Sequence, residues 1–223
     1  MRLKIGVLGG IGPEATGEFY LKLIRKLQEE NMIRSNDDFP QIFINSIPAP
    51  ELVFDKIKDS DLDMYYEGIK ELNKFNPDFI VMVCNTIHLF ISKLQVISKA
   101  QIIDLRMELR NYLFNENFNK VTIIGSPSTI SNGLYEFSYF EYLNPDINEQ
   151  KVLSDSIFYF NKGIDKEKQK NISSEIAKKY LSRGSEIIIL GCTEFAVMLD
   201  SCDIPKINTI DLLVDSVIKR MKK

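Results

Sequence analysis

The chain has 223 residues, 44% of them hydrophobic, which is enough apolar surface for one globular domain or two small lobes. Its net charge is −3, and lysine and glutamate alternate along the helical segments, which argues against a nucleic-acid-binding surface. Three cysteines without close spacing exclude a disulfide framework and indicate a reducing compartment.

The N-terminal segment predicts neither export nor membrane insertion. MRLKIGVLGGIG runs directly into a predicted strand, without the apolar core of a secretory signal. No aliphatic run approaches the roughly 20 residues that a membrane span needs. We therefore expect a cytoplasmic protein that acts on a small molecule and binds neither nucleic acid nor membrane.

Short aliphatic runs bounded by Gly, Pro or Asn predict buried parallel strands. In chain order they occupy residues 3–8, 42–47, 79–83, 121–124 and 186–190, with a weaker run at 101–105. Helical patterns lie between them, at 13–27, 65–72, 172–180 and 210–221. Strands that alternate with helices predict an α/β fold with right-handed crossovers.

A weak internal repeat divides this pattern into two similar halves. LKIGVLGGIGPEAT, from Leu3, resembles KVTIIGSPSTISNG, from Lys120, and each is followed by a strand that ends in a cysteine. The sequence therefore predicts two pseudo-symmetric lobes, each with a mostly parallel sheet flanked by helices. We expect residues 1–105 and 208–223 in the first lobe and residues 106–207 in the second. Ligands bind beyond the carboxyl ends of such strands, which predicts an active site in the cleft between the lobes.

Cys84 and Cys192 each stand where an aliphatic run ends and a helix begins, in FIVMVCNTIH and EIIILGCTEF. Helix N-terminal amides favour the reactive thiolate there, so we expect a lowered pKa at one of the two sites. A lone cysteine is usually a small buried hydrophobe. Two cysteines in matched contexts instead indicate two thiols facing one substrate carbon, as two-base racemisation requires. Cys202 has neither context, and we interpret it as incidental.

The loop from Gly9 to Thr16 contains the GxGxxA pattern of dinucleotide-binding turns. Pro13 removes an amide donor there, and Glu14 adds a negative charge where a pyrophosphate would bind. We therefore favour a loop that binds a small anion or the substrate backbone. A tight strand-to-helix turn with Pro13 at the first helical position explains the pattern equally well.

Short polar residues follow both cysteines. Asn85, Thr86 and Thr193 are suited to cap the helices that begin there, and a bound carboxylate would meet the same side chains and free amides. His88 follows Cys84 by four residues, hence on a similar helix face. It could orient the thiolate, join a zinc site with the three cysteines, or pack a helix; the closely spaced cysteine pairs of structural zinc sites are missing from the sequence.

On these residues the chain resembles the aspartate/glutamate racemase family, in particular its aspartate racemase branch. The resemblance rests on GGIGPEAT at 9–16, CNTIH at 84–88, SPSTISNGLYE at 126–136, EQ at 149–150 before a helix and GCTE at 191–194. It implies the two-lobe fold, a homodimer, and catalysis without pyridoxal phosphate, another cofactor or a metal.

Carried over by position, the resemblance implies that Cys84 and Cys192 are the catalytic thiols. The residues it implies for the substrate's α-carboxylate and amino group are Asn85, Thr86, Thr193, Ser126 and Thr129. It further implies that Ile11 lines the cleft and that Lys162 faces the side-chain carboxylate. Leu52 stands where many aspartate racemases have an arginine that clamps this carboxylate, which argues against strict aspartate specificity.

The sequence thus predicts a cofactor-independent amino-acid racemase, with aspartate as the expected substrate. One thiolate would take the Cα proton and the other thiol would return a proton on the opposite face. The alternatives are a broad-specificity racemase, a glutamate or hydantoin racemase, or a maleate isomerase-like enzyme. From another class, the chain could be a non-catalytic binding protein with a nucleotide in the Gly10 loop.

Overall fold

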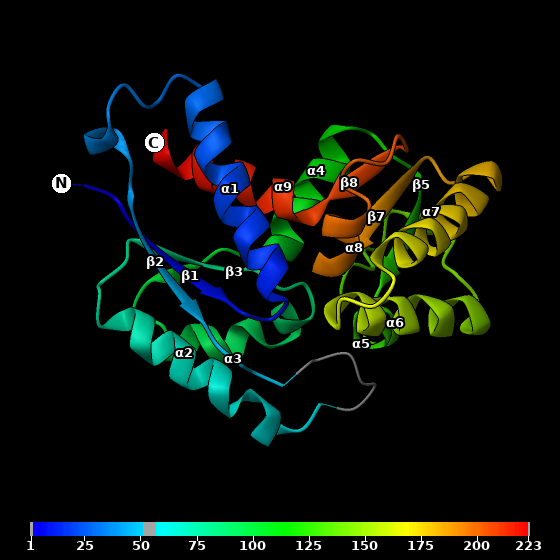
Figure 1. Ribbon diagram of the computed structural model, residues 1–223, viewed down its shortest axis with the longest axis horizontal. Coiled ribbons are helices and arrows are strands. Elements are labelled where there is room, and N and C mark those ends of the chain that lie inside the picture. Colours follow the sequence, from blue (N-terminus) through cyan, green and yellow to red (C-terminus); the bar gives the residue numbers. More distant parts are fainter. Residues whose placement is uncertain (1, 51–56, 223) are drawn as a thin grey trace.

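The computed structural model describes residues 2–50 and 57–222 and contains two four-stranded parallel sheets (Figure 1). The first has the order β2-β1-β3-β4 and the second the order β6-β5-β7-β8, so corresponding strands occupy corresponding places. The strands are β1 (Lys4–Gly9), β2 (Gln41–Ser46), β3 (Phe79–Met82), β4 (Gln101–Ile102), β5 (Lys120–Gly125), β6 (Glu141–Tyr142), β7 (Ile187–Gly191) and β8 (Lys206–Asn208). The predicted α/β class with two similar lobes is confirmed.

Helices cover both faces of each sheet, which explains why the sequences of the central strands are nearly continuous apolar runs. All residues of β3 and β7 are buried, and β1 and β5 are buried beyond their first residue. The helices are α1 (Pro13–Glu29), α2 (Asp63–Asn73), α3 (Ile91–Ile97), α4 (Leu105–Asn115), α5 (Pro127–Ser131), α6 (Ile147–Asn161), α7 (Lys166–Ser182), α8 (Thr193–Met198) and α9 (Thr209–Met221). Three short 3-10 segments are η1 (Asn36–Asp38), η2 (Asp59–Leu62) and η3 (Thr86–Phe90).

The structure departs from the sequence prediction mainly in its short elements. The strand expected at 101–105 ends at Ile102, and α4 begins three residues later. Strands β6 and β8 were not predicted, because two or three residues are too few to show a period. Helix α6 begins at Ile147 behind an Asp146 cap, so Glu149 and Gln150 lie in its first turn rather than before it.

The described residues form two apolar clusters, and the two lobes share the larger of them. Helix α9 contacts α1 and α4, and Figure 1 shows it running between the two halves. One cluster of buried side chains joins Val7 and Phe19 of the first half to Leu190 of the second through Val214 of α9. The expected division of the chain between the lobes stays a prediction; Asn208, placed in the first lobe by that division, ends β8 of the second sheet.

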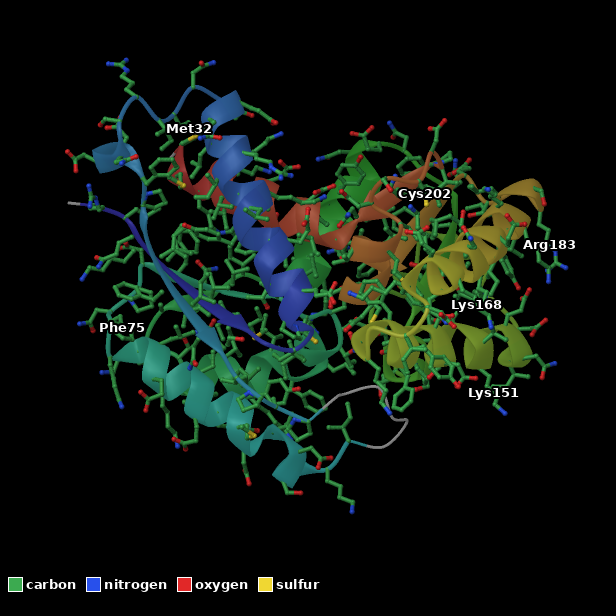
Figure 2. All side chains as sticks on the ribbon, in the orientation of Figure 1. Met32, Phe75, Lys151, Lys168, Arg183 and Cys202 are labelled. Carbon is green, nitrogen blue, oxygen red and sulfur yellow. The ribbon has the colours of Figure 1, made fainter. Side chains whose placement is uncertain are left out.

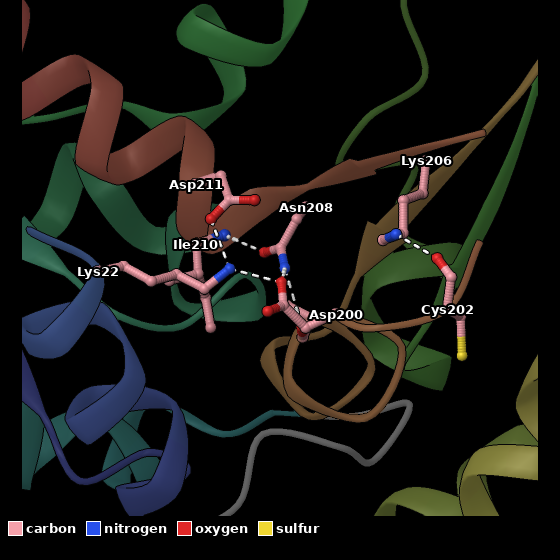
Figure 3. A network of polar contacts seen from close by, with 8 residues as sticks. Lys22, Asp200, Cys202, Lys206, Asn208, Ile210 and Asp211 are labelled. Atoms are coloured by element: carbon pink, nitrogen blue, oxygen red, sulfur yellow. Dashed lines mark hydrogen bonds and ion pairs between the residues drawn. The ribbon is translucent and has the colours of Figure 1, made fainter. Parts of the chain in front are cut away.

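A charged contact also ties α1 to the second half of the chain (Figure 3). The Lys22 ammonium lies 2.5 Å from the Asp200 carboxylate and 2.6 Å from that of Asp211, and Asn208 donates to Asp200 at 2.7 Å. The side chain of Lys22 is only 14% exposed, but those of Asp200 and Asp211 are 39% and 52% exposed, so solvent screens these contacts. They hold α1 against the segment that follows α8.

The outer helices of the second half expose both charged and large apolar side chains. Lys151, Lys168 and Arg183 lie exposed on and after α6 and α7, and Figure 2 shows them on these outer helices. Among the described residues, no helix combines the length and apolar character of a transmembrane span.

Candidate active site

Cys84 and Cys192 face one cavity of about 200 Å³ between the two halves of the chain. Cys84 follows β3 and Cys192 follows β7, the strands that neighbour β1 and β5 in their sheets. Each cysteine is 7% exposed. The described lining consists of residues 10–13, Ala49, residues 84–86, Asn161 and residues 192–194. This volume suits a ligand of amino-acid size rather than a nucleotide.

The glycine loop of the lining comes close to both sheets' ends. Gly10 has φ +85°, and a Cβ there would lie 2.4 Å from the Ile47 carbonyl oxygen. Gly12 has φ +72°, and its Cβ would lie 2.9 Å from a carboxylate oxygen of Glu194. At both positions a side chain would be disfavoured by the positive φ and would clash with the neighbouring oxygen, so glycine is required. Because Glu194 faces this loop, a pyrophosphate would meet a negative charge there, which argues against the nucleotide alternative.

Glu194 contacts the thiol of Cys192 directly. The Cys192 Sγ–H donates to Glu194 Oε2 at 2.8 Å, Thr193 Oγ1 donates to the same oxygen at 3.3 Å, and Asn161 Nδ2 donates to Oε1 at 3.1 Å. The carboxylate is buried and held at both oxygens. A buried carboxylate in contact with a thiol is an acceptor for the thiol proton. The sequence prediction did not assign Glu194 this role, although it lies two residues after Cys192.

Burial governs the ionisation of both thiols. It raises the pKa of Cys84 to about 12, although the backbone N–H groups of Ile87 and Thr86 at the sulfur lower it. Burial likewise raises the pKa of Cys192 well above its usual value, and the charges of Glu194 and Cys84 raise it further. The expectation of a lowered thiol pKa at one site is therefore wrong: the strand-end amides are present, but desolvation outweighs them. Both groups are thiols at neutral pH, and a thiolate needs a proton acceptor inside the site.

Three buried hydroxyls connect the two halves behind the cavity. Thr86 Oγ1 lies 3.0 Å from Ser126 Oγ and 3.1 Å from Thr129 Oγ1, and Ser126 donates to Thr129 at 3.1 Å. Of these residues only Thr86 belongs to the described lining. Ser126 and Thr129, expected to hold the substrate, thus lie behind Thr86 and bind its hydroxyl. Ile11, Asn85 and Thr193 line the cavity, and their role in substrate binding stays a prediction.

His88 packs into the protein rather than against the thiol. Its Nδ1 lies 2.8 Å from the Cys84 carbonyl oxygen and its Nε2 3.3 Å from that of Ile103. Burial lowers its pKa, while the Asp104 charge opposes this. Cys202 is half-buried outside the lining, and its carbonyl accepts from Lys206 (Figure 3). The zinc set considered from the sequence therefore does not assemble, and no group of three metal-ligating side chains was found among residues 2–50 and 57–222.

The lining that the structure describes does not include the residues that the resemblance implied for the distal carboxylate. Lys162 caps α6 with its ammonium 4.0 Å from the ring centroid of Phe158, outside the described lining, whereas its neighbour Asn161 belongs to the lining. Leu52 lies outside the described residues. Within the described lining, Glu194 is the one carboxylate, and no lysine or arginine is present.

The two lobes have equivalent parallel sheets, and each contributes one thiol to the cavity between them. Comparison with known protein families shows which class of protein has these features. The chain belongs to the Asp/Glu/hydantoin racemase family, whose profile matches residues 8–217. This membership places it among the isomerases, in the cofactor-independent class of amino-acid racemases.

Individual relatives share the whole length of the chain. The broad-specificity amino-acid racemase RacX of Bacillus subtilis (strain 168) is 26% identical to this chain, and the aligned region covers 96% of each protein. The aspartate racemase of Picrophilus torridus has the same fold with a TM-score of 0.83, 24% identity and coverage of 99% of this chain and 95% of that one. An aspartate racemase homologue from Pyrococcus horikoshii OT3 has a TM-score of 0.77, with 23% identity and full coverage of both chains.

Proposed function

We propose that this protein racemises α-amino acids by a two-base mechanism in which Cys84 and Cys192 act on opposite faces of Cα. The observation that carries the proposal is the placement of two thiols at equivalent strand ends of two equivalent sheets, facing one small cavity. Deprotonation of Cα gives a planar carbanion, and its configuration inverts when the proton returns from the other side.

The proton balance of this mechanism includes Glu194. The Cys192 Sγ–H donates to the Glu194 carboxylate, so transfer of that proton gives a Cys192 thiolate and a neutral carboxylic acid. The thiolate then takes the Cα proton while the Cys84 thiol gives its own proton to the opposite face, which leaves Cys84 as the thiolate. The other enantiomer uses the same steps in reverse, starting from the form that the first turnover leaves, in which Cys84 is the thiolate and Cys192 and Glu194 carry the protons. Hydrogen bonds to the substrate carboxylate stabilise the enediolate-like intermediate.

We propose that aspartate is one of several substrates. Three observations support a broad range: the described lining lacks a cation, Leu52 replaces the clamping arginine in the sequence, and the curated relative is a broad-specificity racemase. Lys162 remains our proposed partner for a distal carboxylate, because it adjoins the lining residue Asn161. The exposed contact with Phe158 is worth only about 0.5–1 kcal/mol, so a substrate carboxylate can compete for the ammonium.

Lys162→Ala is therefore expected to lower kcat/KM for aspartate by about ten- to one-hundredfold and to leave alanine nearly unaffected. The magnitude is that of one hydrogen bond to a charged group, about 1.5–3 kcal/mol. The measurement is kcat/KM for both amino acids in wild type and variant, with the exposed Lys168→Ala as the matched control. An unchanged preference for aspartate in Lys162→Ala would place the distal carboxylate elsewhere.

The function itself is tested by incubating the purified enzyme with single L-amino acids in deuterated water, with a chelator and without added cofactor. The proposal predicts the D-enantiomer with solvent deuterium at Cα, for aspartate and for at least one uncharged amino acid. If no amino acid of the panel exchanges its Cα hydrogen or inverts, the proposed activity is wrong. From the family resemblance we also propose a homodimer, and from the three cysteines without disulfide spacing we propose a cytoplasmic location.

A further inference from the structure

A buried chain of hydrogen bonds holds the side chain of Asn85, which lines the cavity beside Cys84. The Tyr135 hydroxyl donates to Asn85 Oδ1 at 2.5 Å, and Asn85 Nδ2 donates to Thr209 Oγ1 at 3.1 Å. Thr209 in turn donates to the carbonyl oxygen of Leu190 at 2.9 Å. Tyr135 and Thr209 are fully buried, and Asn85 is nearly so. The three side chains lie far apart in the sequence and meet only in the folded protein.

The hydrogen bond from Thr209 to Leu190 decides which groups donate and which accept along this chain of hydrogen bonds. A backbone carbonyl only accepts, so the single proton of the Thr209 hydroxyl is used on Leu190. Thr209 Oγ1 can then only accept from Asn85, which requires the amide nitrogen on that side. If the amide were flipped, its oxygen would face an oxygen without a proton, and two acceptors would be opposed in a buried place. The amide oxygen of Asn85 therefore faces Tyr135.

One amide hydrogen of Asn85 remains after these bonds. Nδ2 carries two hydrogens, and Thr209 takes one of them. The second has no partner among the described residues, while Asn85 forms part of the cavity lining. An amide N–H beside Cys84 binds an acceptor such as a carboxylate oxygen. Glu194, the one carboxylate of the described lining, contacts the Cys192 thiol instead.

We propose that Tyr135 is a positioning residue that, together with Thr209, locks the Asn85 amide so that it offers the cavity an N–H donor and binds the substrate α-carboxylate beside Cys84. This inference rests on the proposed racemase function and adds the orientation of the substrate. Burial raises the pKa of the Tyr135 hydroxyl well above its usual value, so the hydroxyl keeps the proton that it donates. Tyr135 itself is not part of the described lining, so it acts through Asn85.

The test is Tyr135→Phe, which removes the hydroxyl and keeps the ring. Without this donor the Asn85 amide is held by Thr209 alone. The amide oxygen loses its partner, and the N–H is no longer fixed in the position in which it faces a bound carboxylate. We expect kcat/KM to fall by about ten- to one-hundredfold for every amino acid that the enzyme accepts, the range for loss of one hydrogen bond to a charged group. Tyr180→Phe is the matched control, because Tyr180 is also a buried tyrosine and its hydroxyl binds Glu149 and Asp146 outside the cavity. It is expected to lower Tm and leave kcat and KM unchanged.

A role through Asn85 also predicts non-additive effects. In an Asn85→Ala background, Tyr135→Phe should cause no further loss. Thr209→Val, which keeps the shape and removes the hydroxyl, should reproduce the loss if Tyr135→Phe does not fold, and Thr209→Ser should restore activity. Wild-type kinetics in a folded Tyr135→Phe or Thr209→Val variant, or a full additional loss in the Asn85→Ala background, would overturn the inference. An inactive wild type would instead contradict the proposed function.

Discussion

Cys84→Ala and Cys192→Ala are each expected to lower racemisation by at least about 10²- to 10⁴-fold, the usual contribution of a general acid or base. Each thiol serves one face of Cα, and the other titratable side chains of the described lining, Cys192 and Glu194, form a hydrogen bond with each other. Each substitution removes one sulfur atom from a buried site and leaves the surrounding strand and helix ends in place, so both variants should fold. The measurement is the rate of chiral inversion, with Tm recorded for each variant.

Cys202→Ala is the matched control for this prediction. Cys202 lies outside the described lining and contributes its backbone carbonyl, not its thiol, to the contact with Lys206. Its replacement should leave the rate unchanged. If either Cys84→Ala or Cys192→Ala racemised amino acids at the wild-type rate, the assignment of two thiol bases would fail.

Glu194→Gln is expected to lower kcat by about 10²-fold or more at neutral pH. The glutamine can still accept a hydrogen bond from the Cys192 thiol, but it cannot take the proton. Since burial holds the pKa of Cys192 well above its usual value, few enzyme molecules would then carry the thiolate. The control is Glu149→Gln, because Glu149 is also largely buried but pairs with Lys179 and Tyr180 away from the cavity. That variant should lose stability and keep its kcat.

The pH dependence separates proton transfer from a merely structural role of Glu194. In the Glu194→Gln variant the thiol proton must leave to solvent, so raising the pH increases the thiolate fraction. Because the charge of Glu194 raises the pKa of Cys192, its loss also lowers that pKa and further increases the thiolate fraction. The deficit relative to wild type should therefore shrink as the pH rises within the range in which the protein stays folded. A deficit that stays constant across this range would show that Glu194 does not accept the proton.

The fold was predictable because its central strands bury both faces. The runs that became β1, β3, β5 and β7 are mostly aliphatic, and a small-residue turn or a cysteine marks the end of each. The repeat of this pattern was sufficient to predict two similar lobes. Pro13 begins α1, as its fixed φ and missing amide proton predicted. Strand β8 was not predictable, since its three residues are placed by pairing with β7.

The candidate site was less predictable from the sequence than the fold. A glutamate two residues after Cys192 reads as an ordinary first-turn residue that complements the helix dipole. It becomes the partner of a thiol because the Gly12 loop, from the other end of the chain, and Asn161 bury and hold it. The contact between Tyr135 and Asn85 likewise depends on tertiary packing. The raised thiol pKa values follow from burial, which a local sequence motif does not specify.

The most direct test of two thiols on opposite faces is Cα hydrogen exchange by the single-cysteine variants in deuterated water. Each enantiomer of a substrate is incubated separately with Cys84→Ala and with Cys192→Ala, and deuterium at Cα and configuration are both measured. The account predicts that each variant exchanges one enantiomer without inverting it, and that the two variants act on opposite enantiomers. Exchange of the same enantiomer by both variants, or inversion by either one at the wild-type rate, would contradict it.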